Sequence, residues 1–214
     1  RKNRSDGSLL KVKMKPLLIT IATDNIRKDC QVILDNQAEY AAARGMEHRI
    51  TTEIHWTDLH PSFSKVWEIH RALEEGAEYF IWADSDVAFT NFKIDLFKLL
   101  TPDYFLAAYR QTNWKSWAYL CCGLQVFKNT PQARAYVAAW VKRVEGRFMK
   151  DHPFEQWYFD EILRETKWAN IRCCTGVEIG CFSKEIWHDG TLWQKGYPSV
   201  HLGGPATWER RAEV

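Results

Sequence analysis

The chain has 214 residues, of which 46% are hydrophobic and 26% are charged. This length suits one domain with a substantial core, and this composition is ordinary for a globular protein. The formal net charge of +2 gives no argument for a nucleic-acid partner. Residues 1–14 are basic, polar and aperiodic, so we interpret them as a tail or cloning remnant and expect residues 15–214 to form the single domain.

The cysteines and the hydropathy pattern bear on the compartment. None of the six cysteines forms a C-x-x-C pair, and the two vicinal pairs are poor zinc or disulfide frameworks. Unpaired cysteines favour a cytoplasmic location. No stretch is long enough to span a membrane and no signal peptide is recognisable, so we expect a soluble fragment. A location in the Golgi lumen is the alternative if an anchor was removed upstream of Arg1. The sequence does not indicate the oligomeric state.

The first half of the chain alternates strand and helix patterns. Short apolar runs indicate buried strands, apolar residues at helical spacing indicate helices, and Gly45 and Gly76 are natural helix stops. This alternation predicts right-handed crossovers and a mostly parallel sheet. The absence of a G-x-G-x-x-G motif argues against a dinucleotide-binding loop. The predicted elements are a strand at 17–22, a helix at 27–44, a strand at 48–56, a helix at 64–75 and a strand at 79–82.

Two positions in this half have both a structural and a functional interpretation. Asp24 or Asn25, just after the first strand, could cap the following helix, or the whole turn could contact a nucleotide. Lys65 lies in the first turn of the predicted helix 64–75, where the helix dipole slightly disfavours a cation. A lysine there is usually solvated, but its charge would be useful if a phosphate docked at that helix end.

The run Asp84-Ser85-Asp86 follows directly after the apolar strand 79–82. Two neighbouring carboxylates repel each other unless a cation or a shared proton compensates. A hard divalent ion such as Mn²⁺ or Mg²⁺ does this through oxygen ligands and substrate phosphates. The carboxyl end of a strand is also where α/β sheets bind ligands. The alternative is that both aspartates are simply turn residues.

The second half continues with less regular patterns. Trp114, Trp117 and Tyr119 crowd a connecting loop and could serve packing or form a sugar platform. Gly123 interrupts a strand, which suggests a bulge or the close approach of a ligand. The expected elements are a short helix at 94–100, strands at 105–109 and 120–127, a helix from 129 to about 144, and a helix beginning near 155.

Acidic residues open the last predicted helix, and a histidine stands near the end of the chain. Glu155, Gln156 and Asp160 share the early turns of that helix, as a solvated acidic helix start or as part of a site. His201 precedes Gly203 and Gly204, where a compact backbone lets a metal or phosphate come close. A single histidine can equally be structural.

Taken together, these stretches resemble the GT-A glycosyltransferases, most closely the galactosyl-, mannosyl- and xylosyltransferases of the fungal and plant type. The resemblance covers roughly residues 15 to 205. It implies a Rossmann-like three-layer α/β sandwich with a mostly parallel central sheet, in which residues 15–214 are the catalytic domain. It rests on the order and spacing of Ser64-Lys65-Val66, Trp82-Ala83-Asp84-Ser85-Asp86, Cys122-Gly123-Leu124-Gln125-Val126-Phe127, Phe154-Glu155-Gln156 and His201-Leu202-Gly203-Gly204.

The resemblance also implies an activity, namely transfer of a sugar from a nucleoside-diphosphate sugar, with UDP or GDP as the usual nucleotide, to a hydroxyl of a glycan acceptor. Asp86 and His201 would bind Mn²⁺ or Mg²⁺. Asp84 would bind the metal too, or hold the ribose or a metal-bound water. Glu155 and Gln156 would lie at the reacting face, where many relatives have Asp-Gln, with Asp160 as a second candidate. The nucleotide sugar would be contacted by Ala22, Thr23, Asn25, Lys65, Asp84, Ser85, Gly123 and Gly204, of which Gly123 would leave room for the sugar.

Three other interpretations remain. Phosphatases of the haloacid dehalogenase type also place D-x-D after an apolar strand, but near the start of their fold, whereas two strand–helix units precede Asp84 here. A non-catalytic carbohydrate-binding domain would suit the eleven tryptophans, yet it has no need of an aspartate pair. The third is a structural domain in which the D-x-D has no role.

Overall fold

The computed structural model describes residues 14–110, 120–146, 155–166, 170–182 and 197–201. A six-stranded sheet forms its centre, in the order β2-β1-β3-β6-β5-β7. Strand β6 runs antiparallel to its neighbours β3 and β5, and the other five strands run in one direction. The predicted mostly parallel sheet is therefore confirmed. Its strands are β1 (Leu17–Ile21), β2 (Glu47–Thr51), β3 (Tyr79–Ala83), β5 (Leu106–Arg110), β6 (Leu120–Lys128) and β7 (Ile171–Cys174).

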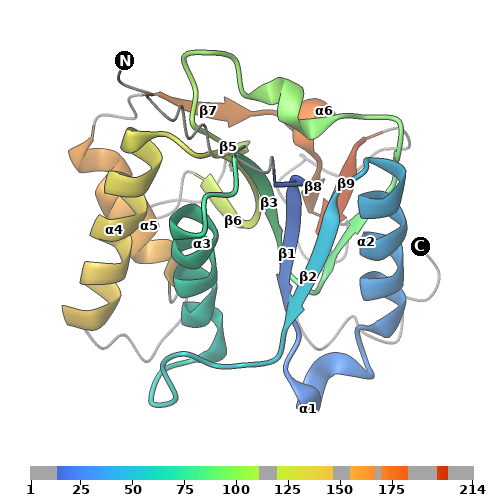
Figure 1. Ribbon diagram of the computed structural model, residues 1–214, viewed down its shortest axis with the longest axis horizontal. Coiled ribbons are helices and arrows are strands. Elements are labelled where there is room, and N and C mark those ends of the chain that lie inside the picture. Colours follow the sequence, from blue (N-terminus) through green and yellow to red (C-terminus); the bar gives the residue numbers. More distant parts are fainter. Residues whose placement is uncertain (1–13, 111–119, 147–154, 167–169, 183–196, 202–214) are drawn as a thin grey trace, which may run out of the picture.

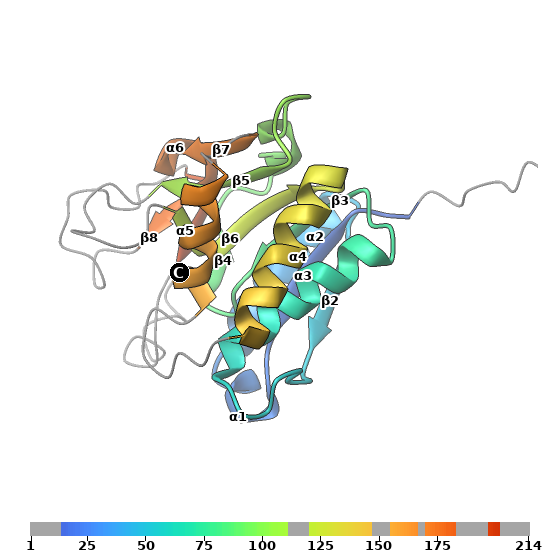
Figure 2. The ribbon, with the colours of Figure 1, turned by 90° about the vertical axis from the view of Figure 1, so that its left-hand side faces the viewer.

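Helices cover both faces of this sheet, which makes three layers. Helices α3 (Ser64–Glu74), α4 (Pro131–Gly146) and α5 (Glu155–Glu165) lie on one face and α2 (Gln31–Ala43) on the other (Figures 1 and 2). Successive strand residues alternate between the two faces. Accordingly, Phe80 and Trp82 join the core beneath α3, α4 and α5, while Ile81 and Ala83 join the core beneath α2.

A second, three-stranded sheet lies beside the end of β3. It has the order β4-β9-β8 and consists of β4 (Val87–Phe89), β8 (Cys181–Phe182) and β9 (Ser199–His201). Strand β9 pairs antiparallel with β4, so that His201 lies opposite Val87. This pairing brings a residue from the end of the described chain next to Asp86. A short helix, α6 (Gly176–Ile179), precedes β8.

Three predicted boundaries are wrong. The helix expected at 27–44 begins only at Gln31, as α2, because the apolar periodicity begins only at Cys30. A separate short helix, α1 (Asp24–Arg27), precedes it and buries no residue. The strand expected at 48–56 ends at Thr51, where its partner β1 also ends. The helix expected at 94–100 is a single 3-10 turn, η2 (Leu96–Leu99). Another 3-10 turn, η1 (Pro61–Phe63), precedes α3. In the described part of the chain, no helix is both long and apolar enough to cross a lipid bilayer.

Candidate metal and nucleotide site

The turn between β3 and β4 carries Asp84, Ser85 and Asp86. The amide of Asp84 donates to the carbonyl of Gly123 at 2.8 Å, and the amide of Val87 donates back to the carbonyl of Asp84 at 3.0 Å. The buried Gln37 of α2 donates its amide to the carbonyls of Asp84 and Val87, at 2.9 Å each. The turn is therefore held from both sides by the surrounding fold, which fixes the direction of its side chains.

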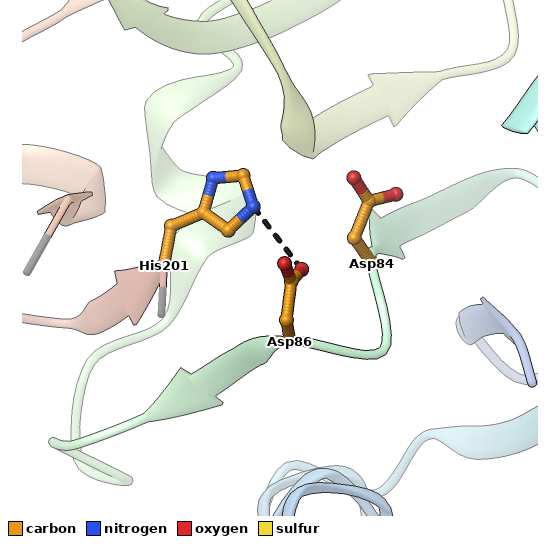
Figure 3. Close-up of side chains that lie close together, drawn as sticks. All are labelled: Asp84, Asp86 and His201. Atoms are coloured by element: carbon orange, nitrogen blue, oxygen red, sulfur yellow. Dashed lines mark ion pairs between the residues drawn. The ribbon is translucent and has the colours of Figure 1, made fainter. Parts of the chain in front are cut away.

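His201 completes a cluster with the two aspartates. Its Nε2 lies 3.1 Å from Oδ1 of Asp86, and Figure 3 shows the ring directed at that carboxylate. One ligand atom each from Asp84, Asp86 and His201 lies within 4.8 Å of the others. Burial alone would lower the pKa of His201, but the carboxylate of Asp86 outweighs burial and raises it well above the ordinary value. The cluster thus favours a cation, and two carboxylates with one imidazole are donors that Mn²⁺ accepts.

Gly123 leaves the space that the imidazole of His201 occupies. A Cβ built on Gly123 would lie 2.5 Å from Cε1 of His201 and 2.8 Å from its Nδ1. The sequence suggested a bulge or the close approach of a ligand at Gly123, and the group that lies against it here is this ring. The neighbouring Cys121, which sequence reasoning missed, places Sγ 3.6 Å from Nδ1 of the same ring. The pairing of β5 with β6 also shifts register between Ala108 and Arg110, which fits the expected irregularity.

Lys65 is buried behind the aspartates, with 3% of its side chain exposed, so the expectation of a solvated lysine is wrong. Its Nζ lies 2.9 Å from Oδ1 of Asp84 and 2.8 Å from Oε1 of Glu155. The indole Nε1 of Trp82 donates to the same Asp84 oxygen at 2.7 Å. Burial would lower the pKa of Lys65, but Asp84 and Glu155 together raise it above the ordinary value. The two carboxylates therefore favour the charged form of the lysine inside the site.

A charge count for this region favours a divalent ion. Asp84, Asp86 and Glu155 contribute three carboxylates, and Lys65 contributes one ammonium. A metal would displace the proton that Asp86 favours on His201, because an imidazole ligand is neutral. With that neutral His201, two negative charges remain, which one divalent cation would balance. Burial raises the pKa of Asp84, although the ammonium of Lys65 opposes that effect. A bound cation would reverse the influence of burial and keep the carboxylate ionised.

A pocket of about 200 Å³ opens next to this cluster. Four of the residues predicted to contact a nucleotide sugar line it, namely Thr23, Lys65, Asp84 and Ser85. Sequence reasoning missed that His60, Pro61 and Ser62, in and next to η1, line this pocket. The Pro61-Ser62 pair before a helix is nevertheless a recognisable helix-start signal. The pocket is lined by Ile21, Thr23, Ile26, His60, Pro61, Ser62, Lys65, Trp82, Asp84, Ser85 and Asp86.

Ala22 and Asn25, which were also predicted to contact the nucleotide sugar, do not line the pocket. Ala22 is fully buried against Cys30 and Leu34. Asn25 is exposed, and its Oδ1 accepts a hydrogen bond from the Thr23 hydroxyl at 2.5 Å. Thr23, rather than Asp24 or Asn25, occupies the N-cap position of α1.

The predicted reacting-face residues of α5 differ in their surroundings. Oε1 of Gln156 accepts from the amide of Cys122 at 3.4 Å, which ties α5 to β6. Asp160 is buried, and its Oδ2 lies 2.7 Å from Arg164 on the same helix. Gly204 and the aromatic residues Trp114, Trp117 and Tyr119 lie outside the described residues.

Comparison with known proteins identifies the fold. No protein-family model and no curated protein matches the sequence. Among solved structures, a glycosyltransferase involved in glycosylation of the major capsid of PBCV-1 has a TM-score of 0.75 and 17% identity, over 94% of this chain and 100% of that one. The galactosyltransferase LgtC, solved with donor and acceptor sugar analogues, has a TM-score of 0.56 and 12% identity, over 92% of this chain and 94% of that one. Mouse xyloside xylosyltransferase 1 has a TM-score of 0.53 and 10% identity, over 88% and 97% of the two chains.

These similarities define the class of fold. The chain has the GT-A fold that the sequence predicted, with the central sheet and the helices on both of its faces. The first of these structures, the PBCV-1 capsid glycosyltransferase, is matched along its whole length. The α/β core of this chain is thus that of a glycosyltransferase fold.

Proposed function

We propose that this protein is a metal-dependent glycosyltransferase. It would move a sugar from a nucleoside-diphosphate sugar, with UDP favoured over GDP, to a hydroxyl of a glycan or glycoconjugate. The observation that carries the proposal is the convergence of Asp84, Asp86 and His201 beside a pocket at the carboxyl end of β3. In an α/β sheet this is the expected position of a ligand.

The metal would be held by the residues that converge. Asp86 and His201 would bind Mn²⁺ or Mg²⁺ directly, and Asp84 would provide a further ligand or hold a metal-bound water or the ribose. When bound, the ion would supply Lewis-acid stabilisation for the negative charge on the departing diphosphate. Asp84 and Asp86 line both the cluster and the pocket, so that one ligand could contact the metal and the pocket together.

The pocket would take the nucleotide part of the donor. Its lining combines the polar Thr23 and Ser85 with apolar groups such as Ile21 and Trp82, which suits a ligand with one aromatic and one polar part. Gln156 and Asp160 stay as proposals for the reacting face of the site. An acceptor hydroxyl needs a positioned carboxylate base or assistance from the leaving phosphate.

The proposal predicts a joint effect of metal and nucleotide on thermal unfolding. Ligands that bind only the folded state raise its stability by mass action. We expect a rise in Tm with one nucleoside diphosphate from a panel, only when Mn²⁺ is present, and no rise with an Asp86→Asn variant. If no combination of nucleotide and Mn²⁺ moves Tm, the proposal is wrong. Turnover of an aryl phosphate lost in Asp84→Asn would instead favour a phosphatase, and glycan binding that persists in EDTA would favour a binding domain.

A further inference from the structure

Glu155 lies where it can act on Lys65 but is poorly placed to act on a substrate. Its side chain is 8% exposed, and its Oε1 accepts from Nζ of Lys65 at 2.8 Å. Its backbone carbonyl accepts from Nε1 of the buried Trp140 at 3.1 Å, which anchors this end of α5 in the core. Glu155 is not among the described residues that line the pocket. A general base must come within hydrogen-bond reach of the acceptor hydroxyl, and this carboxylate instead faces a cation inside the protein.

The ammonium group of Lys65 in turn contacts the carboxylate of Asp84. Its Nζ is 2.9 Å from Oδ1 and 3.1 Å from Oδ2 of Asp84, so that one ammonium contacts both oxygens of that carboxylate. The same Nζ lies 5.6 Å from the centre of the Trp82 ring, within the range of a cation–π contact. Glu155, Asp84 and the indole therefore surround the ammonium. A lysine in these surroundings is less suited to holding a free phosphate than the sequence resemblance implied.

We infer that Lys65 and Glu155 are positioning residues, in which Glu155 holds Lys65 and Lys65 holds the Asp84 carboxylate at the metal cluster. This inference rests on the proposed metal-dependent function. The two residues act on the Asp84 carboxylate together, and the loss of either one would disturb it. Without Glu155, the charge of Lys65 would be balanced by Asp84 only and would oppose a divalent ion at the same carboxylate. Without Lys65, the partly buried Asp84 would lose the contact that orients both of its oxygens.

The test is Mn²⁺ binding in the absence of nucleotide, measured as free Mn²⁺ by electron paramagnetic resonance. Changes to residues that hold a metal ligand in place weaken metal affinity by about 10–100-fold. We expect Glu155→Gln to weaken Mn²⁺ binding by about tenfold or more. Glu161→Gln on the same helix is the matched control, because Glu161 pairs with Arg143 away from the site, and it should bind Mn²⁺ like the wild type. An unchanged Mn²⁺ affinity in Glu155→Gln, with a loss confined to kcat, would show that Glu155 acts on the substrate and would overturn the inference.

A double variant separates positioning from a simple charge effect. Lys65→Met combined with Glu155→Gln removes one positive and one negative charge and so leaves the net charge of the site unchanged. Replacing both partners of a buried ion pair is also tolerated better than removing one of them. We expect the double variant, folded by circular dichroism, still to bind Mn²⁺ about tenfold more weakly than the wild type, because Asp84 has lost its ammonium. Recovery of wild-type affinity would overturn positioning. If the wild type binds Mn²⁺ only with a nucleoside diphosphate, the same variants are compared with the diphosphate present. A wild-type protein that binds no Mn²⁺ in either condition would instead overturn the proposed function itself.

Discussion

Replacement of Asp86 by asparagine should abolish metal-dependent sugar transfer while the protein stays folded. The variant keeps the size of the side chain but removes the charge beside His201, whose Nε2 lies 3.1 Å from the Asp86 carboxylate. Loss of a ligand to a Lewis-acid metal costs several kcal/mol of transition-state stabilisation, so we expect turnover to fall on the order of a thousandfold. The measurement is kcat at saturating Mn²⁺ and donor.

The control for this variant is Asp103→Asn. Asp103 is exposed in the turn before β5, and β5 runs in the same direction as β3, so this turn lies at the opposite edge of the sheet from the cluster. Its replacement should leave turnover unchanged. Circular dichroism of both variants checks that the fold persists. Near-normal turnover of Asp86→Asn would remove Asp86 from the metal site.

Replacement of Gly123 by alanine should displace His201 and so damage the cluster without touching any of its ligands. The added Cβ would lie 2.5 Å from Cε1, 2.8 Å from Nδ1 and 3.1 Å from Nε2 of the imidazole, and the nearest two distances are closer than real Cβ contacts. The ring must therefore leave the position in which its Nε2 lies 3.1 Å from Asp86. A misplacement of about 1 Å in a catalytic constellation costs about a hundredfold in rate. We expect a loss of this size in kcat/KM, accompanied by weaker Mn²⁺ binding.

Gly146→Ala is the matched control, since nothing lies within 4 Å of a Cβ built there. It should bind Mn²⁺ and turn over like the wild type. The far-ultraviolet circular dichroism of both variants should match the wild type, because Gly123 does not have a positive φ. Wild-type Mn²⁺ affinity in Gly123→Ala would contradict the assignment of His201 to the metal.

The sequence was informative about elements whose signals are local. The apolar runs 17–22 and 79–82 and the helix pattern at 64–75 correspond to β1, β3 and α3, since burial of one face leaves a periodic pattern. The start of α2 at Gln31, later than expected, could have been read from the same periodicity, which begins only at Cys30. The end of β2 could not, because it depends on where the partner strand β1 ends.

The candidate site was predictable as a set of residues but not as a set of contacts. Asp84 and Asp86 follow a strand, so their placement at the sheet edge is local. The approach of His201 depends on the pairing of β9 with β4, between strands more than a hundred residues apart, which no local pattern encodes. The burial of Lys65 likewise depends on the start of α5 coming close to the start of α3, which brings Glu155 to its ammonium. Long-range packing therefore decided the roles of residues that the sequence had singled out.

The most direct test of the central claim is release of nucleoside diphosphate from a panel of nucleotide sugars, with Mn²⁺ and with EDTA. Glycosyl transfer, to an acceptor or slowly to water, leaves the free diphosphate as a product. We predict release from one nucleotide class, dependent on Mn²⁺, and absent in Asp86→Asn. Release that continues unchanged in EDTA, or no release from any donor in the presence of a broad set of glycan acceptors, would contradict a metal-dependent glycosyltransferase.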